Sequence, residues 1–136
     1  MGSGAKMNVS QAARQQLIAA AQTAAEAAYA PYSDYQVGAA LLFDDGAVVT
    51  GANVENASYG LTICAERAAI FAAVAAGRKR MVKVAVSADG LRNPLPCGAC
   101  LQVMREFGVE RVLIDRGDGK FDSYEFSELL PLPFDL

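Results

Sequence analysis

The stretch MVKVAVSADGLRNPLPCGACLQVMREFGVERVLID, residues 81–115, predicts a strand, a helix and a second strand in succession. Met81 to Ala88 is a short apolar run rich in Val, which is typical of a buried strand. After a loop with two prolines, Gly98 to Phe107 predicts a helix that Gly108 ends, and Val109 to Asp115 is again strand-like. A strand–helix–strand unit of this kind is typical of α/β proteins.

The flanking sequence extends this alternation of strands and helices. Because helices of 10 to 15 residues separate strands, we expect a mostly parallel sheet with helices on both faces. The other expected elements are a helix from an N-cap at Ser10 to about Tyr29, a β-hairpin of Val37 to Phe43 and Ala47 to Val54, a helix from Ile63 to Ala76 ended by Gly77, a loop from Asp89-Gly90 to Pro96, a short strand from Lys120 to Phe126, and a helical turn over 127–130.

The length of the chain predicts one domain. Its 136 residues match the size of a single compact unit, so we expect one domain over 1–136, with 1–9 as a flexible N-terminal segment. The longest apolar stretch, Ala68 to Ala76, is far shorter than the roughly 20 residues of a membrane span. The first residues lack the apolar core of a secretory signal. These features predict a cytoplasmic protein with reduced thiols and no membrane partner.

The sequence contains no histidine. This excludes Ser-His-Asp and Cys-His nucleophiles and histidine-based zinc sites, so catalysis would depend on carboxylates, thiolates or a metal. The net charge is −3, and the one basic cluster, Arg78-Lys79-Arg80, follows a predicted helix end. A protein that binds nucleic acid typically carries a basic surface. Because this chain has a negative net charge, we expect no nucleic-acid partner.

Cys64, Cys97 and Cys100 all lie at predicted helix N-termini, where free amides and the helix dipole favour thiolates. Buried free cysteines, a thioredoxin-type Cys-x-x-Cys pair and a papain-like signature are alternative interpretations. The protease interpretation lacks a histidine base. A closed zinc site needs four protein ligands, so three cysteines leave one position open unless a carboxylate or another chain fills it. An open position is typical of catalytic zinc.

The motif Cys64-Ala65-Glu66-Arg67, followed about thirty residues later by Pro96-Cys97-Gly98-Ala99-Cys100, has the layout of zinc-dependent base deaminases in their three-cysteine variant. Three further segments complete the pattern: YSDYQVGAAL at 32–41, NVEN at 53–56 and LLP at 129–131. In this order the motifs resemble the small homotetrameric cytidine deaminases over about residues 10–134. The resemblance implies a three-layer α/β/α sandwich with a mixed, mostly parallel five-stranded sheet.

The resemblance also implies a chemistry for these residues. Cys64, Cys97 and Cys100 would hold one Zn²⁺ per chain, which supplies hydroxide at neutral pH. Glu66 would shuttle protons while hydroxide adds at C4 of cytidine or 2′-deoxycytidine, so that uridine or 2′-deoxyuridine and ammonia result. Arg67 would hydrogen-bond a cysteine sulfur and offset the negative charge of the three thiolates. On its own, Glu66 could instead be a first-turn glutamate that complements the helix dipole, and Arg67 a surface side chain.

Substrate contacts are the other implication. Two residues apart on a predicted strand, Asn53 and Glu55 share one face, and in the family these positions hold the ribose. Tyr35 stands where the family usually has Phe, and Leu101 where many relatives carry Arg. Ala57, Tyr59 and Phe134 match positions that neighbouring subunits share in a homotetramer. The expected nucleoside contacts are therefore Tyr35, Asn53, Glu55, Ala57, Tyr59, Ala65 and Phe134.

Other functions remain open at this point. A deaminase of another amino-bearing heterocycle, such as a nucleoside antibiotic, would share the same metal motif. A polynucleotide-editing deaminase is disfavoured by the charge balance, and a non-catalytic zinc-binding module would explain the cysteines but not the adjacent Glu66.

Overall fold

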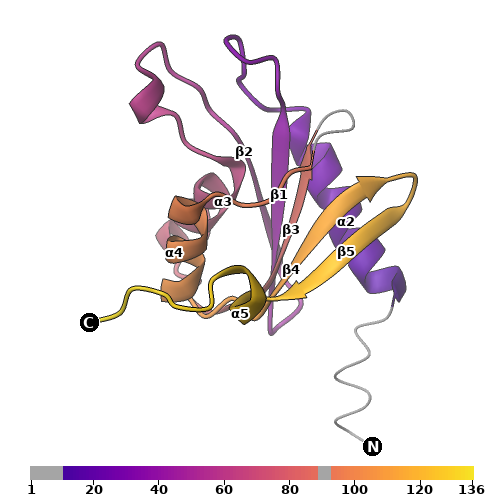
Figure 1. Ribbon diagram of the computed structural model, residues 1–136. Helices are drawn as coiled ribbons and strands as arrows, with labels where there is room; N and C mark the ends of the chain where they lie inside the picture. Colours follow the sequence, from indigo (N-terminus) through magenta and orange to yellow (C-terminus); the bar gives the residue numbers. More distant parts are fainter. Residues whose placement is uncertain (1–10, 89–92) are drawn as a thin grey trace, which may run out of the picture.

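A computed structural model describes residues 11–88 and 93–136. Five strands form one sheet in the order β2-β1-β3-β4-β5. Helix α2 covers one face, and α3 and α4 cover the other, which confirms the expected three-layer sandwich (Figure 1). The elements are α2 (Gln11–Ala25), β1 (Val37–Phe43), β2 (Val48–Ala52), the 3₁₀ turn η1 (Tyr59–Leu61), α3 (Ala65–Ala75), β3 (Met81–Ala88), α4 (Gly98–Glu106), β4 (Arg111–Gly117), β5 (Lys120–Glu125) and α5 (Phe126–Leu129).

The strand directions correct one expectation. The sheet is mixed and five-stranded, but among the described strands β3 and β4 form the only parallel pair, whereas β1–β2, β1–β3 and β4–β5 are antiparallel. The prediction of a mostly parallel sheet is therefore wrong. Tight turns join β1 to β2 and β4 to β5, and such turns connect antiparallel neighbours, whereas a parallel neighbour needs a long crossover.

The same topology brings two helix starts together. Strands β2 and β3 both run antiparallel to β1, so they point the same way and end at the same edge of the sheet. Helix α3 follows β2 and α4 follows β3 along the chain. Both helices therefore begin at this edge, which is also where β1 begins.

Several element boundaries differ from the sequence prediction. The first helix ends at Ala25, and Tyr29 instead forms a parallel bridge with Val54. Strand β4 starts at Arg111, because the Val109 N–H bonds back to Met104 at the end of α4. The predicted ends of α3 and α4 are confirmed, because Gly77 and Gly108 follow these helices and both have positive φ. The predicted N-cap at Ser10, the N-terminal segment 1–9 and the Asp89-Gly90 part of the loop lie outside the described residues.

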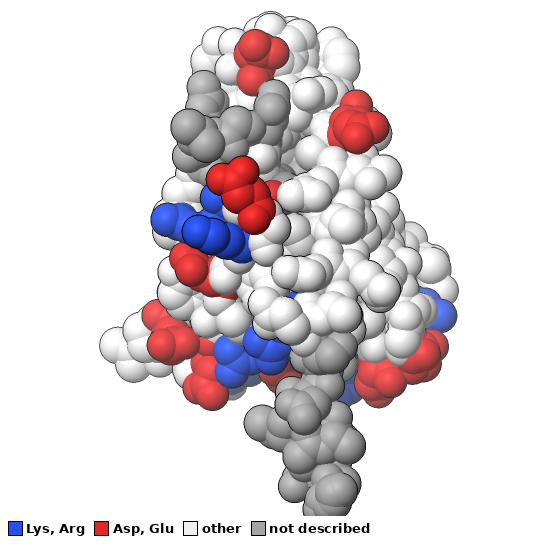
Figure 2. Space-filling model, turned by 90° about the vertical axis from the view of Figure 1, so that its right-hand side faces the viewer, with Lys and Arg blue, Asp and Glu red and all other residues white. Residues whose placement is uncertain are grey.

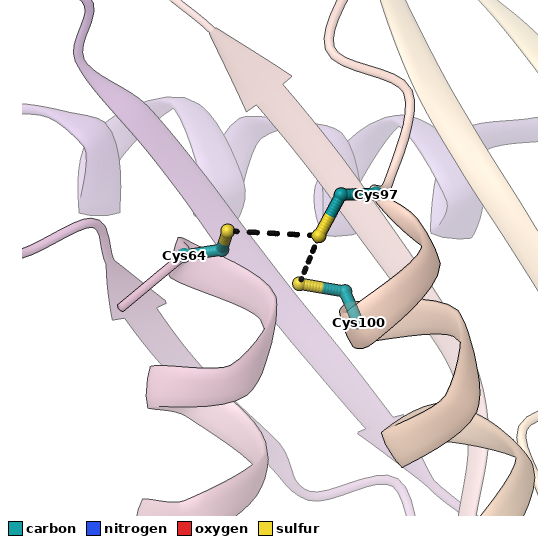
Figure 3. A group of neighbouring side chains, drawn as sticks. All are labelled: Cys64, Cys97 and Cys100. Atoms are coloured by element: carbon teal, nitrogen blue, oxygen red, sulfur yellow. Dashed lines mark hydrogen bonds between the residues drawn. The ribbon is translucent and has the colours of Figure 1, made fainter. Parts of the chain in front are cut away.

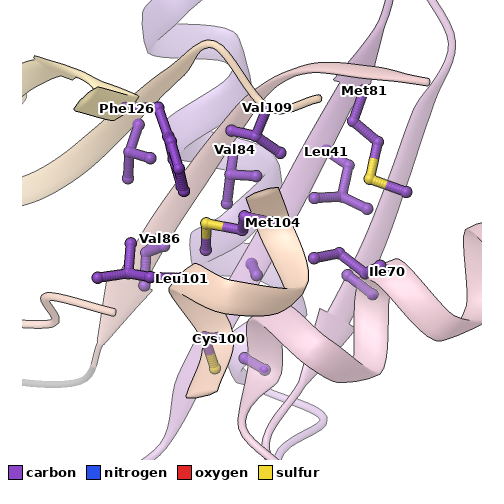
Figure 4. Close-up of a cluster of buried hydrophobic side chains, with 14 of the residues drawn as sticks. Leu41, Ile70, Met81, Val84, Val86, Cys100, Leu101, Met104, Val109 and Phe126 are labelled. Carbon is purple, nitrogen blue, oxygen red and sulfur yellow. The ribbon is translucent and has the colours of Figure 1, made fainter. Parts of the chain in front are cut away.

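The core lies mainly between the sheet and the α3–α4 layer (Figure 4). Close backbone contact fixes α3 there: a Cβ on Gly51 of β2 would lie 2.5 Å from the Ala69 nitrogen and 2.9 Å from the Ala65 oxygen. On the other face, a Cβ on Gly38 would lie 1.9 Å from the Ala21 oxygen of α2. Glycine at these positions lets both helix layers touch the sheet backbone. Within the described residues, no helix combines the length and apolarity that crossing a membrane requires.

Candidate metal centre and active site

Three thiols meet where α3 and α4 begin (Figure 3). Cys64 and Cys97 are the N-cap residues of the two helices, and Cys100 lies in the first turn of α4. The Sγ atoms of Cys64 and Cys97 are 3.9 Å apart, and those of Cys97 and Cys100 are 3.5 Å apart. All three sulfur atoms lie within 4.8 Å of one another. Cys100 is fully buried, whereas Cys97 is exposed, so the cluster opens to solvent on one side.

This geometry fits a zinc ion. Zn–S bonds of about 2.3 Å in a tetrahedral arrangement place sulfur atoms about 3.8 Å apart. The two short sulfur–sulfur distances, 3.5 and 3.9 Å, lie on either side of that value. Among the described residues, the three cysteines are the one group of this kind that could hold a metal. Three protein ligands leave a fourth coordination position for water or substrate.

The surroundings stabilise a thiolate at Cys64. Hydrogen bonds from Cys100, Arg67 and Cys97 together outweigh the effect of burial and lower the pKa of Cys64 to about 5, with Cys100 making the largest contribution. The hydrogen bond between Cys64 and Cys100, together with burial, raises the pKa of Cys100. Arg67 Nη2 donates to the Cys64 Sγ at 3.4 Å. The hydrogen bond that the resemblance implied for Arg67 is thus present in the fold.

Glu66 is a buried carboxyl beside the thiols. It lies in the first turn of α3 with 4% of its surface exposed. Burial, with a smaller contribution from the charge of Cys64, outweighs the backbone hydrogen bond and Arg67 and raises the pKa of Glu66 to about 7. A group with a pKa near the working pH is suited to both taking and giving a proton. A solvent-exposed first-turn glutamate that merely complements the helix dipole would not be buried in this way.

Asn53 and Glu55 lie just beyond β2, which ends at Ala52, so they are not on the strand as predicted but flank the isolated bridge residue Val54. Asn53 instead accepts the Val37 N–H at 2.9 Å and donates to the Tyr35 carbonyl at 2.9 Å. Asn53 therefore binds the loop that precedes β1, and Glu55 binds the same loop at Tyr32 and Ser33. An extended bridge holds them near the cysteines.

That bridge joins Val54 to Ile63 through two backbone hydrogen bonds of 3.0 Å. Val54 lies between Asn53 and Glu55, and Ile63 directly precedes Cys64. The polar pair is thereby fixed beside the start of α3. Sequence spacing alone could not reveal this bridge, because it closes a loop between two irregular segments.

Ser33 is a further residue of the site, for which the motif at 32–41 predicted no role. Its hydroxyl donates to the Glu55 carboxylate, and the Tyr32 and Ser33 N–H groups bond the same carboxylate at 2.9 and 3.2 Å. These bonds lower the pKa of Glu55, with the Ser33 hydroxyl making the largest contribution. The Tyr35 N–H in turn donates to the Ser33 Oγ. The 22-residue separation gave no local signal for this contact.

The remaining predicted contacts differ in their placement. Tyr35 is half-buried, and the Ala65 side chain is fully buried, so Ala65 could meet a ligand only through its backbone. Ala57 is exposed, Tyr59 is 75% exposed, and Phe134 is 70% exposed. Gln102 of α4 bonds both backbone polar groups of Phe134, which holds the C-terminal segment along α4. One chain alone therefore does not enclose these last three residues.

Comparison with known proteins agrees with this site. The family description "Cytidine and deoxycytidylate deaminase zinc-binding region" matches residues 11–115. A cytidine deaminase of Halalkalibacterium halodurans is 53% identical over 123 residues, which cover 89% of this chain and 93% of the relative. The crystal structure of cytidine deaminase from Burkholderia pseudomallei is 47% identical, with a TM-score of 0.82, and the match covers 88% of this chain and 97% of that one. The crystal structure of cytidine deaminase from Mycobacterium tuberculosis is 44% identical, with a TM-score of 0.78, and the match covers 90% of this chain and 98% of that one.

The chain belongs to the cytidine and deoxycytidylate deaminase family, whose members share a zinc-binding region. Within that family, the relatives and structures named above are all cytidine deaminases. The three-thiol cluster lies within the matched region.

Proposed function

We propose that the protein hydrolytically deaminates free cytidine and 2′-deoxycytidine, which yields uridine and 2′-deoxyuridine with ammonia. The observation that carries this proposal is a buried Glu66 beside a cluster of three thiols with one open side. Membership in the deaminase family and identity to cytidine deaminases support the choice of substrate. One zinc ion per chain would occupy the cluster.

When bound, zinc lowers the pKa of its water and so provides a nucleophile at neutral pH. The Glu66 carboxylate would take a proton from the attacking water and deliver it to N3 of the pyrimidine. The same carboxylate then carries a proton to the departing amino group. Its burial keeps bulk water from competing for these protons, and its pKa of about 7 suits both transfers. Arg67 holds the Cys64 thiolate in place and offsets part of the negative charge of the cluster.

The hydrogen bonds still available at Asn53 and Glu55 suit a sugar. Asn53 uses one N–H and one lone pair on the loop before β1, so it retains a second N–H and a second lone pair. Glu55 accepts three bonds and retains lone-pair capacity. A sugar hydroxyl can donate to the carboxylate and accept from the amide. Tyr35, on the same loop, would contact the nucleoside with its ring.

We propose a homotetramer with shared active sites, which the exposed residues at this edge of the sheet support. The Tyr32 and Tyr59 rings pack edge to face, with centroids 6.1 Å apart, yet both remain more than half exposed. Exposed apolar groups that gather near a site are typical of an interface. We infer that Ala57, Tyr59 and Phe134 complete the site of a neighbouring subunit. Large exposed apolar side chains on the surrounding loops are Tyr32, Tyr59, Leu61 and Leu95. The free cysteines fit a protein of the cytoplasm.

Glu66→Gln tests the mechanism. Ultraviolet absorbance on mixing with cytidine or 2′-deoxycytidine should show deamination by the wild type and a loss of at least about 10²-fold in kcat/KM for the variant. Metal analysis should show that the variant still holds zinc. Glu106→Gln, which changes an exposed glutamate at the end of α4, is the matched control and should keep wild-type activity.

Three results would contradict the proposal. Full activity in Glu66→Gln would remove the proton shuttle, and loss of zinc from that variant would make Glu66 a ligand. A zinc-loaded wild type that is inactive on both nucleosides would favour another amino-bearing heterocycle. Adenosine and cytosine belong in the same assay for that reason.

A further inference from the structure

A cavity lies at the end of the sheet opposite the cysteines. Its volume is about 1000 Å³, and it is lined by the start of α2, the first residues of β3 and β4, and the segment from the end of β5 into α5. Four basic side chains from different elements line it: Arg14, Lys83, Arg105 and Arg111. Asp44, Glu110 and Glu125 line it as well, and Arg105 is already paired with Asp135 at 3.0 Å, which leaves Arg14, Lys83 and Arg111 for the argument. Figure 2 shows acidic and basic side chains together at the lower edge of the α2 face, whereas most of that face is uncharged.

Among these basic residues, Lys83 stands out because it is buried. Its neighbour Val84 belongs to the core under α3 and α4, so strand alternation turns Lys83 to the α2 side. It is 8% exposed, and within the described ranges no acid or hydrogen-bond partner reaches its ammonium group. Burial lowers the pKa of Lys83, Arg14 and Arg111 lower it further, and Glu110 opposes them. An ammonium group that has no acidic partner favours the binding of an anion beside it.

The two arginines converge on one hydroxyl. Arg14 Nη1 lies 3.4 Å and Arg111 Nη1 lies 2.8 Å from the Ser123 Oγ. The Arg14 Nε is buried and has no partner in the part of the chain that the structure describes. Arg111 reaches Glu125 at 3.5 Å, where the carboxylate is largely exposed. Donor capacity for an anion therefore remains in the cavity.

We propose that this cavity binds a phosphoryl group, either as free phosphate or as the head of a small phosphate monoester. Guanidinium groups match phosphate oxygens in a forked geometry, and Lys83 supplies a compact charge. The Ser123 Oγ accepts from both guanidinium groups and so holds them close together. Phe43, Phe126 and Leu130 line the same cavity from the side of the α3–α4 core, where they could contact the organic part of an ester that extends around the end of the sheet. The site shares no residue with the cysteine cluster, so binding here is separate from the deamination chemistry.

Isothermal titration calorimetry with inorganic phosphate and with phenyl phosphate, at constant ionic strength, tests the proposal. The wild type should bind at least one of them, and the tighter probe identifies the source as free phosphate or an ester. Lys83→Met should weaken that binding at least tenfold and should leave the protein folded, because it removes a buried charge. Lys79→Met, which changes an exposed lysine after α3, is the matched control and should bind like the wild type.

If Lys83→Met fails to fold, Arg14→Gln carries the same expectation of weaker binding. Absence of binding to the wild type, or unchanged affinity in the cavity variants, overturns the proposal. Analytical ultracentrifugation of Lys83→Met completes the test. A change of oligomeric state in that variant would also overturn the proposal, because Lys83 would then pair with an acidic group of a second copy of the chain and not with a phosphoryl group.

Discussion

Arg67 and Cys64 are joined by a 3.4 Å hydrogen bond across the first turn of α3, and Glu66 lies between them in sequence. This arrangement places one positive charge against a sulfur atom and leaves the adjacent carboxyl buried. The Arg67 Nε is itself buried and has no partner among the residues described. Arg67 therefore contacts the thiol cluster with a partly buried guanidinium group and is not a freely solvated surface side chain.

Arg67→Gln should weaken zinc binding about 10- to 100-fold, because groups that hydrogen-bond metal ligands commonly contribute that much. Competition with a chromogenic chelator measures the affinity. Arg78→Gln is the matched control: it breaks an exposed ion pair with Asp45 at 2.9 Å and should leave zinc affinity unchanged. Equal chelator curves for Arg67→Gln and the wild type would show that Arg67 does not support the ligand.

Ser33→Ala should raise KM for cytidine several-fold with a smaller change in kcat. The hydroxyl fixes the Glu55 carboxylate, which we assign to the sugar and not to the reacting ring. Steady-state kinetics with cytidine separate the two parameters. Ser127→Ala, an exposed position on α5, should behave as the wild type. A pure loss of kcat in Ser33→Ala would contradict this assignment.

Gly51→Ala should destabilise the protein by about 1–3 kcal/mol, which is the usual cost of forcing extra atoms into a packed layer. The new Cβ would meet the Ala69 backbone nitrogen at 2.5 Å and would push α3 away from β2. Urea denaturation measures the loss. Gly60→Ala serves as the comparison, since nothing lies within 4 Å of the Cβ that it adds. Similar unfolding midpoints for the two variants would refute the close approach.

The stability of the metal-free protein should depend on pH through Glu66. Its folded pKa of about 7 lies above the usual 4.5, so the folded state binds this proton more tightly than the unfolded chain. That contribution is complete below pH 4.5 and is lost as the pH rises through 7. Glu66→Gln avoids the loss, so its advantage over the wild type should grow by about 2–3 kcal/mol between pH 5 and 8. Urea titrations of both proteins at several pH values check this, and a constant difference would contradict it.

The sequence predicted the local features of this fold well. The helices after Cys64 and Cys97 begin where their N-terminal positions indicated, because capping and propensity act over a few residues. The mostly parallel pairing was wrong, because the order of strands depends on contacts between distant segments. The partners of Asn53 and Glu55 were not foreseen for the same reason. The basic cavity gave no sequence signal, since Arg14, Lys83 and Arg111 are far apart in the chain.

Because α3 and α4 begin side by side only when β1 lies between β2 and β3, the thiols converge only after the central strands have paired. Cys64 and Cys97 are 33 residues apart, so a metal held by both closes a long loop. Release of a metal bound there and separation of these strands would therefore be linked equilibria, so a strong chelator would lower the stability of this domain. A newly made chain gains its full set of ligands only once β3 is in place. A bound metal would thus mark the molecules in which β2, β1 and β3 have paired.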